Sequence, residues 1–444
     1  MITRILISLL VMNELLHTRQ VMKSLAALSS SLLLVSTCFA DWPFWRGDLA
    51  GSGITSESNL PTKWDKKKNV KWRVALPEAG NSSPVISDDR IFLTQPNTEE
   101  KQRGLLCLDR KSGKTLWEKS VEYEAKERTH RTNHFCSSSP ATDGERVIVA
   151  YGSVGIFCYT TDGRELWRRD LGTIDHVWGY GSSPLIHEDL CIHYHGPGKG
   201  AALVALDKET GKTVWRFDEP TWKPGKRTDG FRGQSDGGII GAFGTPIIVR
   251  SGDRHELIMS FPMEMKAFDP KTGKELWSCE GLNPLVYTSP VHHDGKLVAM
   301  GGYYGNSIGV RTGGKGNVTG KRLWQEIRHH GGIGTGVAKD GHLYVQDAGG
   351  IAYCIDFASG ATKWKARLPG RGNSWGSFLL AGELIYALSQ TGNTTVFKAS
   401  PEKFESIGVN ELEERTNSSI AVADGDLFIR THEALWRITS PSRN

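Results

Sequence analysis

Short apolar runs separated by polar turns occupy most of the chain, and this pattern is typical of β-strands. In a representative unit, a strand ends at Asp109, a turn containing Gly113 follows, and the next strand carries Trp117. The aspartate can hydrogen-bond into the turn, and the glycine supplies a positive φ there. Further strands, such as 90–94 and 426–430, follow polar turns of their own. The pattern therefore predicts an all-β fold built from repeated units.

The segment 205–215, with the sequence Ala-Leu-Asp-Lys-Glu-Thr-Gly-Lys-Thr-Val-Trp, recurs along the chain. Close copies occupy 107–117, 267–277 and 354–364, and degenerate copies end at Trp167, Trp324 and Phe404. The aromatic residues that end successive copies lie 40 to 62 residues apart. Since a four-stranded propeller blade needs about 40–50 residues, each copy is interpreted as one blade.

A second signature, Ser-Ser-Pro or a variant of it, precedes each copy. It occurs in eight places, at 82–86, 138–140, 182–186, 244–248, 288–291, 334–337, 375–378 and 418–421. The last unit stops at 434–438, one strand short of its Trp-bearing edge, and the strand 70–76 is left over near the N-terminus. We therefore predict an eight-bladed β-propeller of four-stranded antiparallel blades over 69–438. The N-terminal strand closes the ring, which removes the open sheet edge.

These motifs resemble those of the PQQ-like propeller superfamily, named for pyrroloquinoline quinone. The resemblance rests on the Ala-Leu-Asp-x-x-Thr-Gly-Lys-x-x-Trp repeat within 69–438 and on the opening Asp-Trp-Pro-Phe-Trp-Arg-Gly at 41–47, which is similar to the start of exported bacterial members. It implies either a quinoprotein alcohol dehydrogenase or a propeller that assists the assembly of outer-membrane β-barrels. Such a resemblance predicts the fold better than the function, because functions are grafted onto folds.

For the dehydrogenases, the resemblance implies a quinone stacked between a Trp and a disulfide of two adjacent cysteines, with Ca²⁺ held by acidic and amide side chains. This chain has no adjacent cysteine pair and no Cys-x-x-Cys-His motif for covalent haem. No cofactor is therefore firmly predicted, and PQQ is kept only for a quinone site that lacks the disulfide. No His-Glu-x-x-His motif occurs either, and catalytic residues are not identified.

The N-terminus predicts export. An apolar run at 25–35 follows Lys23, and small residues precede Asp41, as in a signal peptide cleaved after Ala40. Met22 is expected to be the true start, and the run is too short to span a membrane. A lipid anchor on Cys38 is less favoured because Thr37 is atypical before a lipidated cysteine. The expected organisation is a signal peptide at 1–40, a linker at 41–68, the propeller at 69–438 and a tail at 439–444, in the periplasm or secreted.

Composition narrows the class of partner. The chain has 444 residues, 38% of them hydrophobic and 51 of them Gly, which excludes disorder and a multi-span membrane protein. The net charge of +5 is small and evenly spread, so nucleic acid is not expected as a partner. The cysteines after the signal show no pairing logic and are expected to be free, buried thiols: Cys107, Cys136, Cys158, Cys191, Cys279 and Cys354.

Function is expected where the repeats differ, in the loops that lead from the outermost strand of one blade to the innermost strand of the next. The turns between second and third strands are expected to reach the same face and to add His193 and His195 to it. Their His, Arg, Asn and aromatic residues suit a small polar or anionic ligand. The predicted ligand-binding residues are His130, Arg131, Asn133, His134, His176, Trp178, Tyr180, His193, His195, Arg232, Gln234, Tyr287, His329, His330, Arg371 and Trp375. His193 and His195 share one strand face, but a surface pair is favoured over a metal site, and no metal is predicted.

Three functional hypotheses follow. The first is an exported module that binds a ligand or an envelope protein through its loop-rich face. The second is a PQQ-dependent oxidoreductase of alcohols or sugars, and the third is an assembly scaffold of the cell envelope. In the alternative without a binding function, the loops only form hydrogen bonds to backbone groups around a water-filled channel. Neither the ligand nor the oligomeric state follows from the sequence.

Overall fold

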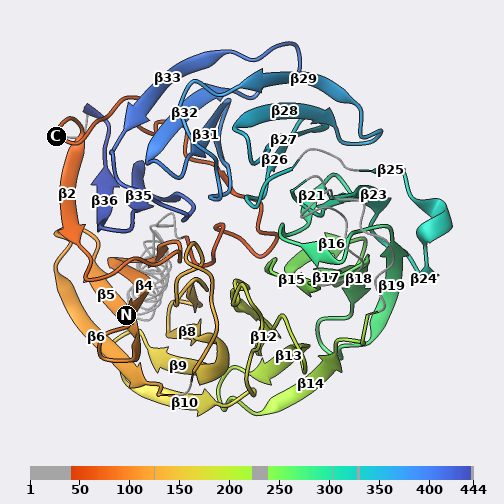
Figure 1. Cartoon of the computed structure of the whole chain (residues 1–444), viewed down its shortest axis with the longest axis horizontal. Coiled ribbons are helices and arrows are strands. Elements are labelled where there is room, and N and C mark those ends of the chain that lie inside the picture. The colour runs from red at the N-terminus through yellow and green to blue at the C-terminus, as the bar shows by residue number, and fades with distance from the viewer. Residues whose placement is uncertain (1–41, 125, 223–238, 304, 328–330, 442–444) are drawn as a thin grey trace, which may run out of the picture. The chain divides into compact units, whose positions relative to one another are not determined.

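A computed structural model describes residues 42–441, except 125, 223–238, 304 and 328–330. These residues belong to the compact unit Ala40–Asn444. Their strands form eight small, mainly antiparallel sheets arranged as the blades of a closed ring (Figure 1). The predicted eight-bladed β-propeller is confirmed. The described residues contain no α-helix, only 3₁₀ turns at Gly152–Val154 and Thr319–Lys321, and so none of their helices could cross a membrane.

Blades 1 to 4 follow the chain, with their strands given from first to last. Blade 1 is β3 (Val85–Ser87), β4 (Arg90–Asn97), β5 (Gln102–Asp109) and β6 (Thr115–Glu122). Blade 2 is β7 (Ala141–Thr142), β8 (Arg146–Ala150), β9 (Ile156–Thr160) and β10 (Glu165–Arg169). Blade 3 is β11 (Leu185–His187), β12 (Leu190–His195), β13 (Ala202–Asp207) and β14 (Thr213–Asp218). Blade 4 is β16 (Ile247–Ser251), β17 (Arg254–Phe261), β18 (Glu264–Phe268) and β19 (Glu275–Glu280), with β24 (Gly316–Asn317) added to its edge.

Blades 5 to 8 complete the ring. Blade 5 is β21 (Val291–His293), β22 (Lys296–Met300), β23 (Ser307–Arg311) and β25 (Trp324–Glu326). Blade 6 is β26 (Val337–Lys339), β27 (His342–Gln346), β28 (Ile351–Asp356) and β29 (Thr362–Arg367). Blade 7 is β30 (Leu379–Ala381), β31 (Leu384–Leu388), β32 (Asn393–Lys398) and β33 (Ser406–Glu411), with β1 (Ile54–Thr55) beside β30. Blade 8 is β34 (Ala421–Ala423), β35 (Asp426–Arg430), β36 (Ala434–Ile438) and β2 (Val70–Ala75), and a small ladder joins β15 (Gly241–Ala242) to β20 (Leu285–Val286).

Closure of the ring by the N-terminal strand is confirmed. β2 pairs antiparallel with β36, from Val70 opposite Ile438 to Ala75 opposite Ala434. Trp72 lies opposite Arg437, next to a register shift like the one beside the Trp of blade 1. Trp72 therefore occupies in blade 8 the position that the repeat Trp occupies in blades 1 to 6.

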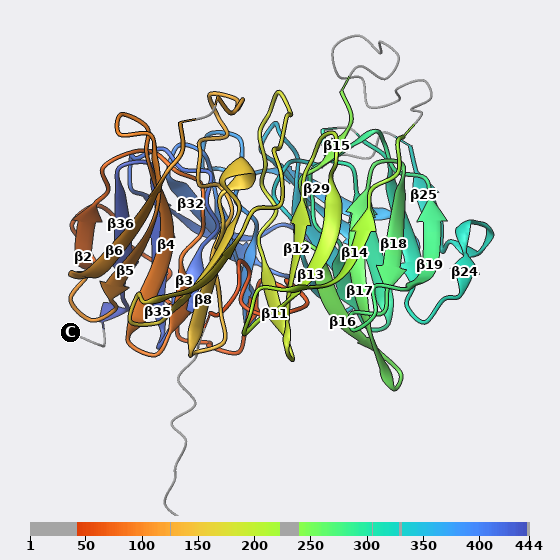
Figure 2. The same ribbon diagram turned by 90° about the horizontal axis from the view of Figure 1, so that it is seen from below.

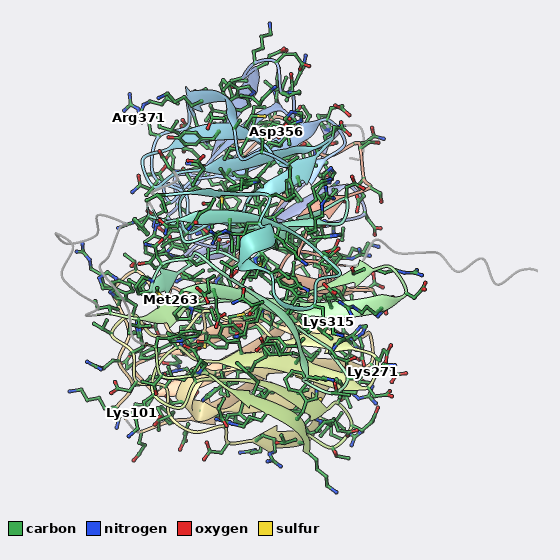
Figure 3. The ribbon with its side chains drawn as sticks, turned by 90° about the vertical axis from the view of Figure 1, so that its right-hand side faces the viewer. Lys101, Met263, Lys271, Lys315, Asp356 and Arg371 are labelled. Carbon is green, nitrogen blue, oxygen red and sulfur yellow. The ribbon has the colours of Figure 1, made fainter. Side chains whose placement is uncertain are left out.

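The strands of each blade run between two faces of the ring (Figure 2). Figure 3 shows Lys101 and Met263, from turns between second and third strands, and Arg371, from a loop between blades, on one face. Lys271, from a turn between a third and a fourth strand, lies on the other. We call these the loop face and the opposite face. As expected, the loops between blades and the second-to-third turns share one face.

Adjacent blades interlock through the repeat Trp and Gly. Trp215 Nε1 donates to Pro270 O in the next blade at 2.9 Å, and a Cβ on Gly273 would lie 2.6 Å from the Trp215 ring. Gly273 also has a φ of +68°, so both the turn and the close approach require glycine. The same pairing occurs in four other places: Trp72 with Gly113, Trp117 with Gly163, Trp167 with Gly211 and Trp324 with Gly360.

Blade 7 departs from the predicted repeat. Val396, in the position where blades 1 to 4 and 6 place Cys or Ala opposite the Trp, faces Gly408. Phe404 precedes β33 and packs against Trp364 and Phe397, with ring centroids 5.8 and 5.3 Å apart. The prediction that Phe404 ends the seventh copy is therefore wrong in register, although its ring still fills the seam after blade 6.

A closed ring of hydrogen bonds joins the innermost strands of all eight blades. In each blade one Ser or Thr of the Ser-Ser-Pro signature donates its backbone N–H to the hydroxyl of the equivalent residue in the next blade, at 2.8 to 3.1 Å. The last bond runs from Ser419 N to Ser83 Oγ and closes the circle. This hydroxyl ring consists of Ser83, Ser139, Ser183, Thr245, Ser289, Thr335, Ser377 and Ser419. The hydroxyl ring explains why the signature carries Ser or Thr, because the hydroxyl of each blade accepts a hydrogen bond from a buried backbone N–H of its neighbour.

The segment 42–55, expected to belong to a linker, runs across the middle of the ring in red in Figure 1. It pairs with innermost strands around the circle: Trp42 with Ile86, and β1 with β30. Arg46 is 2% exposed, and its Nη2 donates to three backbone carbonyl oxygens, those of Ser52, Gly336 and Phe378. Burial lowers the pKa of Arg46 to about 9, so it remains a cation at neutral pH. The segment is thus an integral part of the propeller.

The six cysteines within the described residues are free and buried, as predicted. Cys107, Cys158 and Cys354 lie directly opposite Trp117, Trp167 and Trp364, which confirms that they hold equivalent positions. Burial raises the pKa of their thiols, of Cys107 and Cys158 to about 12 and of Cys354 to about 11. They therefore act as small apolar core residues.

Candidate functional site

A cavity of about 390 Å³ is lined by the innermost strands and the loops that enter them. Each blade contributes the residue two positions before its member of the hydroxyl ring. This residue stands directly before the Ser-Ser-Pro signature in every blade but the seventh, where Trp375 begins the signature. We call these eight residues the lining ring: Asn81, Ser137, Gly181, Phe243, Tyr287, Ile333, Trp375 and Asn417. A single repeat position thus supplies the wall of the site in every blade.

The lining ring is divided into two halves. Blades 4 to 7 contribute Phe243, Tyr287, Ile333 and Trp375, whereas blades 8 and 1 to 3 contribute Asn417, Asn81, Ser137 and Gly181. One semicircle is therefore apolar and aromatic, and the other is polar or small. Trp178, from the loop between blades 2 and 3, adds its ring to the aromatic half.

The aromatic half is a packed wall. Phe243 and Tyr287 stack with ring centroids 5.7 Å apart at 10°, and Trp178 lies 6.3 and 6.0 Å from them. Tyr303 meets Tyr287 edge-on at 5.3 Å and hydrogen-bonds Trp375. These aromatic rings are half-buried, so they still present surface to the cavity. Such a wall suits a ligand with a flat apolar face.

The polar half is a network of amides. Asn81 Nδ2 and Asn417 Nδ2 both donate to Thr132 O, at 3.1 and 2.9 Å. Asn133 Nδ2 donates to the backbone oxygens of Trp178 at 2.6 Å and Tyr180 at 2.9 Å. Asn133 thus ties the polar half to the loop that carries Trp178. These bonds orient the amides, and the lone pairs left on Asn81 Oδ1 and Asn417 Oδ1 are therefore held in fixed directions.

The inner end of the cavity is formed by six members of the hydroxyl ring and by Trp45 of the N-terminal segment. The Arg46 guanidinium lies 5.6 Å from the centroid of the Trp45 ring. Because 42–55 crosses the ring here, the site takes the form of a funnel with a closed base.

Among the described lining residues there is no Asp, Glu, Lys or Arg. His130 is the one histidine among them, and a hydrogen bond of 2.7 Å joins its Nδ1 to Thr132 Oγ1. The described wall is therefore polar without carrying a formal charge, which suits an uncharged ligand better than an anionic one.

Six of the predicted site residues line the cavity together: His130, Asn133, Trp178, Tyr180, Tyr287 and Trp375. Arg131 and Arg371 are exposed and do not line it. Figure 3 shows Arg371 at the edge of the loop face. Arg232, Gln234, His329 and His330 lie outside the described residues.

The other predicted histidines lie apart from the cavity in local contacts. His176 packs behind the aromatic wall, 5.8 Å from Trp178 and 5.3 Å from Phe243 between ring centroids. His134 pairs with His432 at 5.0 Å. His193 and His195 are each 3% exposed within β12, so the expectation of a surface pair is wrong. Burial lowers the pKa of His193 to about 3 and of His195 to about 4, so both are neutral core residues.

Several lining residues were missed by the sequence interpretation, among them Trp45, Asn81 and Phe243. Asn81 and Phe243 stand directly before a Ser-Ser-Pro signature, so the repeat alignment contained the signal that would have found them. Trp45 had no such signal, because it lies outside the repeats and its place depends on how 42–55 crosses the ring.

One further motif has a structural explanation. Residues 372–376 read Gly-Asn-Ser-Trp-Gly, the pattern of a hydrolase nucleophile elbow. Ser374 is 3% exposed, and its hydroxyl lies within hydrogen-bond distance of Leu388 O, 2.5 Å, and Gly376 O, 3.2 Å. No strand-to-helix turn follows it, since β30 begins at Leu379. Ser374 therefore serves to hold the loop before Trp375.

Comparison with known families identifies the fold's relatives. A family model for PQQ-like repeats, described as outer membrane protein assembly factor BamB, matches residues 52–134, 102–314 and 264–403. The chain belongs to this PQQ-like propeller family. A search of the curated proteins found no significant match.

Solved structures agree with this assignment. BamB from Moraxella catarrhalis matches with a TM-score of 0.59 and 13% identity, over 84% of this chain and 98% of that one. A quinohemoprotein alcohol dehydrogenase from Comamonas testosteroni matches with a TM-score of 0.65 and 11% identity, over 90% and 80%. A europium-containing methanol dehydrogenase matches with a TM-score of 0.64 and 11% identity, over 88% and 89%. At these identities the likeness shows the fold alone.

The described residues of the cavity do not fit PQQ. The quinone carries three carboxylates, and its family site adds Ca²⁺, which takes oxygen ligands that usually include carboxylates. The lining described here offers neither Lys nor Arg for the quinone carboxylates and neither Asp nor Glu for the ion. The described cysteines are buried and unpaired, so no disulfide is present among them to stack on a quinone.

Proposed function

We propose that the protein is an exported binding module that holds a small, uncharged, polyhydroxylated ligand, of which a saccharide ring is the simplest example, in the funnel. One observation carries the proposal, namely the division of the lining ring into an aromatic half and a polar half without formal charge. A pyranose ring has an apolar C–H face and a rim of hydroxyls, and it would place these against the two halves.

The interactions that the lining can form, compared with the hydration that a ligand loses on binding, favour a neutral ligand. The aromatic wall of Trp178, Phe243 and Tyr287 removes apolar ligand surface from water. The Nδ2 groups of Asn81 and Asn417 donate to acceptors within the protein, whereas each Oδ1 accepts one hydrogen bond and keeps a lone pair to which a ligand hydroxyl can donate. An anionic ligand would lose its hydration without gaining a cationic partner from the described wall, and this loss costs several kcal/mol. The proposal therefore narrows the sequence-based expectation of a polar or anionic ligand to a neutral one.

Export is part of the proposal. Its support is that the first described residue, Trp42, is already 4% exposed and pairs with Ile86, so cleavage after Ala40 would leave the packed segment intact. The family model's description as an outer membrane assembly factor favours the same compartment. Determination of the N-terminal residue of protein recovered from a bacterial periplasm tests this, and a start at Asp41 is the expected result.

Docking of an envelope protein is the second candidate function. It is favoured by the description of the family model and by Val177, which is 41% exposed next to Trp178. Affinity capture from envelope extracts distinguishes the two roles. A protein partner that is lost in Val177→Asp, with no saccharide bound, would favour docking over ligand binding.

The binding proposal is tested by calorimetric titration of the purified chain with neutral oligosaccharides and with matched uronic-acid oligosaccharides. We expect binding of neutral sugars only. Trp178→Ala should weaken it by about tenfold or more, which is roughly 1.4 kcal/mol, because the aromatic face is lost. Trp178→Phe should retain most of the affinity.

Leu116→Ala is the matched control, since Leu116 is 50% exposed on the outermost strand of blade 1 and lies outside the cavity. It should leave binding unchanged. Absence of binding to any neutral sugar, tighter binding of the acidic sugars, or equal affinity in Trp178→Ala would each overturn the proposal.

A further inference from the structure

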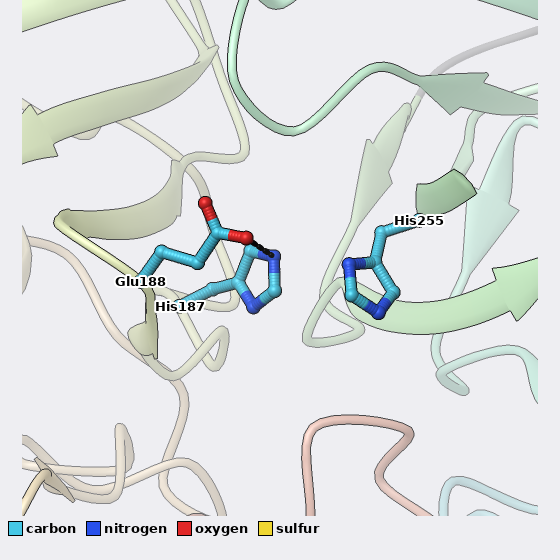
Figure 4. Close-up of side chains that lie close together, drawn as sticks. All are labelled: His187, Glu188 and His255. Atoms are coloured by element: carbon cyan, nitrogen blue, oxygen red, sulfur yellow. Dashed lines mark ion pairs between the residues drawn. The ribbon is translucent and has the colours of Figure 1, made fainter. Parts of the chain in front are cut away.

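His187, Glu188 and His255 gather at the seam between blades 3 and 4 (Figure 4). His187 ends β11 and Glu188 follows it in the turn to β12, whereas His255 lies near the start of β17. Both turns join first to second strands, so the cluster lies on the opposite face, away from the funnel. None of the three residues lines the cavity.

The three side chains point toward one another. One ligand atom from each lies within 4.8 Å of those of the other two. His187 Nε2 and Glu188 Oε1 are 3.9 Å apart, and the two imidazole rings meet edge-on with centroids 5.0 Å apart. Glu188 has a φ of +51°, which belongs to the tight turn and fixes where its side chain starts.

His187 provides an independent sign of a missing ligand. Its residue is 7% exposed, and its Nε2 is buried without a hydrogen-bond partner among the described residues. A buried polar atom without a partner costs free energy, and such atoms in native structures usually face a ligand, an ion or water. This nitrogen faces Glu188 and His255.

We propose that His187, Glu188 and His255 bind a divalent transition-metal ion, with Zn²⁺ as the reference ion. Two imidazoles and one carboxylate are a common three-ligand set for zinc, and water takes the fourth position. Ligand atoms of a tetrahedral zinc site lie about 3.4 Å apart, given bonds of about 2.1 Å. Glu188 and His255 are exposed and can rotate inward by this small amount, while buried His187 stays in place.

Lys271 is the charged neighbour of the site. Its Nζ lies 3.0 Å from Glu188 Oε2, which leaves Oε1 directed toward His187. The ammonium repels a bound cation, so Lys271 lowers the affinity without blocking a ligand atom. Removal of its charge by Lys271→Met should therefore tighten metal binding.

The consequence is a clamp across one seam of the ring. The ligands come from two blades, so binding adds a bridge between them and stabilises the folded state according to the ion concentration. This inference does not rest on the binding of a ligand in the funnel.

The test is calorimetric titration of the tag-free chain with ZnCl₂, together with thermal unfolding with and without the ion. We expect one Zn²⁺ per chain and a higher Tm. His255→Ala and Glu188→Gln, both at exposed positions where folding is preserved, should weaken binding by about tenfold or more. His187→Ala should do the same, and Lys271→Met should strengthen it.

His342→Ala is the matched control, because His342 occupies the start of β27 in blade 6, outside the cluster. It should bind Zn²⁺ like the unchanged chain. The proposal is overturned if the unchanged chain binds no Zn²⁺, or if His255→Ala and Glu188→Gln bind it as tightly as the His342→Ala control.

Discussion

At the scale of single residues, two repeat positions have different tasks. The repeat glycine lets one blade approach the Trp of its neighbour, as Gly273 does at Trp215. The residue two positions before each member of the hydroxyl ring faces the funnel instead, and it varies from Asn81 to Trp375 around the ring. The glycine is constrained by packing, whereas the lining position is free to change chemistry without altering the fold.

Gly273→Ala should destabilise the protein more than Gly252→Ala. Both glycines have positive φ, +68° and +60°, so both substitutions carry similar backbone strain. A Cβ at 273 would also lie 2.6 Å from the Trp215 ring, whereas nothing lies within 4 Å at 252. We expect an extra loss of about 1–3 kcal/mol for Gly273→Ala, measured by urea unfolding. An equal loss of unfolding free energy in the two variants would show that the Trp215 ring can move to accommodate a Cβ at position 273.

At the scale of elements, the innermost strands are too short to form many hydrogen bonds within their own blades, and the hydroxyl ring anchors them instead. β3, β11 and β34 have three residues each, and β7 has two. Eight hydroxyls accept eight backbone amides in a closed circle, so each short strand is anchored to the next blade. This anchoring fixes the start of every loop that reaches the funnel.

Ser139→Ala should cost about 1–3 kcal/mol, because the buried N–H of Ser83 would lose its acceptor. Ser139→Thr should cost much less, since Thr245 and Thr335 already serve at the same position. Ser139 does not line the cavity, so both variants can be compared by chemical denaturation without a change in ligand binding. A Thr variant as unstable as the Ala variant would argue against the hydroxyl as the cause.

At the scale of the molecule, the N-terminal segment joins innermost strands of several blades. Residues 42–55 contact innermost strands on several sides of the channel, and Trp45 reaches the funnel.

Three histidines are buried in the folded chain. His176, His193 and His195 are each 7% exposed or less. Burial lowers the pKa of His193 to about 3 and those of the other two to about 4.

The stability of the protein should fall as the pH drops from about 6.5 toward about 4. In this range the unfolded chain binds protons at these histidines while the folded chain does not, so the folded state is penalised. Each pKa unit corresponds to roughly 1.4 kcal/mol per histidine. Burial raises the pKa of Glu219, which works in the opposite sense at the acidic end of the range.

Urea unfolding at pH 7.5 and pH 5 measures the effect. His193→Gln removes the contribution of the histidine with the most strongly lowered pKa and should flatten the pH dependence. Equal stability at both pH values, or an unchanged slope in His193→Gln, would mean that the histidines are accessible to protons in the folded state.

Much of the fold followed from local patterns. The Asp, Gly and Trp of each copy predicted a turn and an outer strand, and the unmatched strand 70–76 predicted the closing of blade 8 against β36. These inferences succeeded because each blade is held by contacts within itself and with its nearest neighbours. The register of blade 7 failed because Gly408 replaces the aromatic residue there and Phe404 fills the space from outside the strand.

The sequence by itself determined the number of blades, their strand order, the closure of the ring and the free cysteines, since these depend on residues close together in the chain or in equivalent repeats. Only the tertiary structure decided which loop residues meet. It turned His193 and His195 into the core, brought Trp45 to the funnel across the whole ring, and joined His187 to His255 from separate blades. These neighbours are set by loop paths and by contacts between distant segments, and no local pattern encodes such distances.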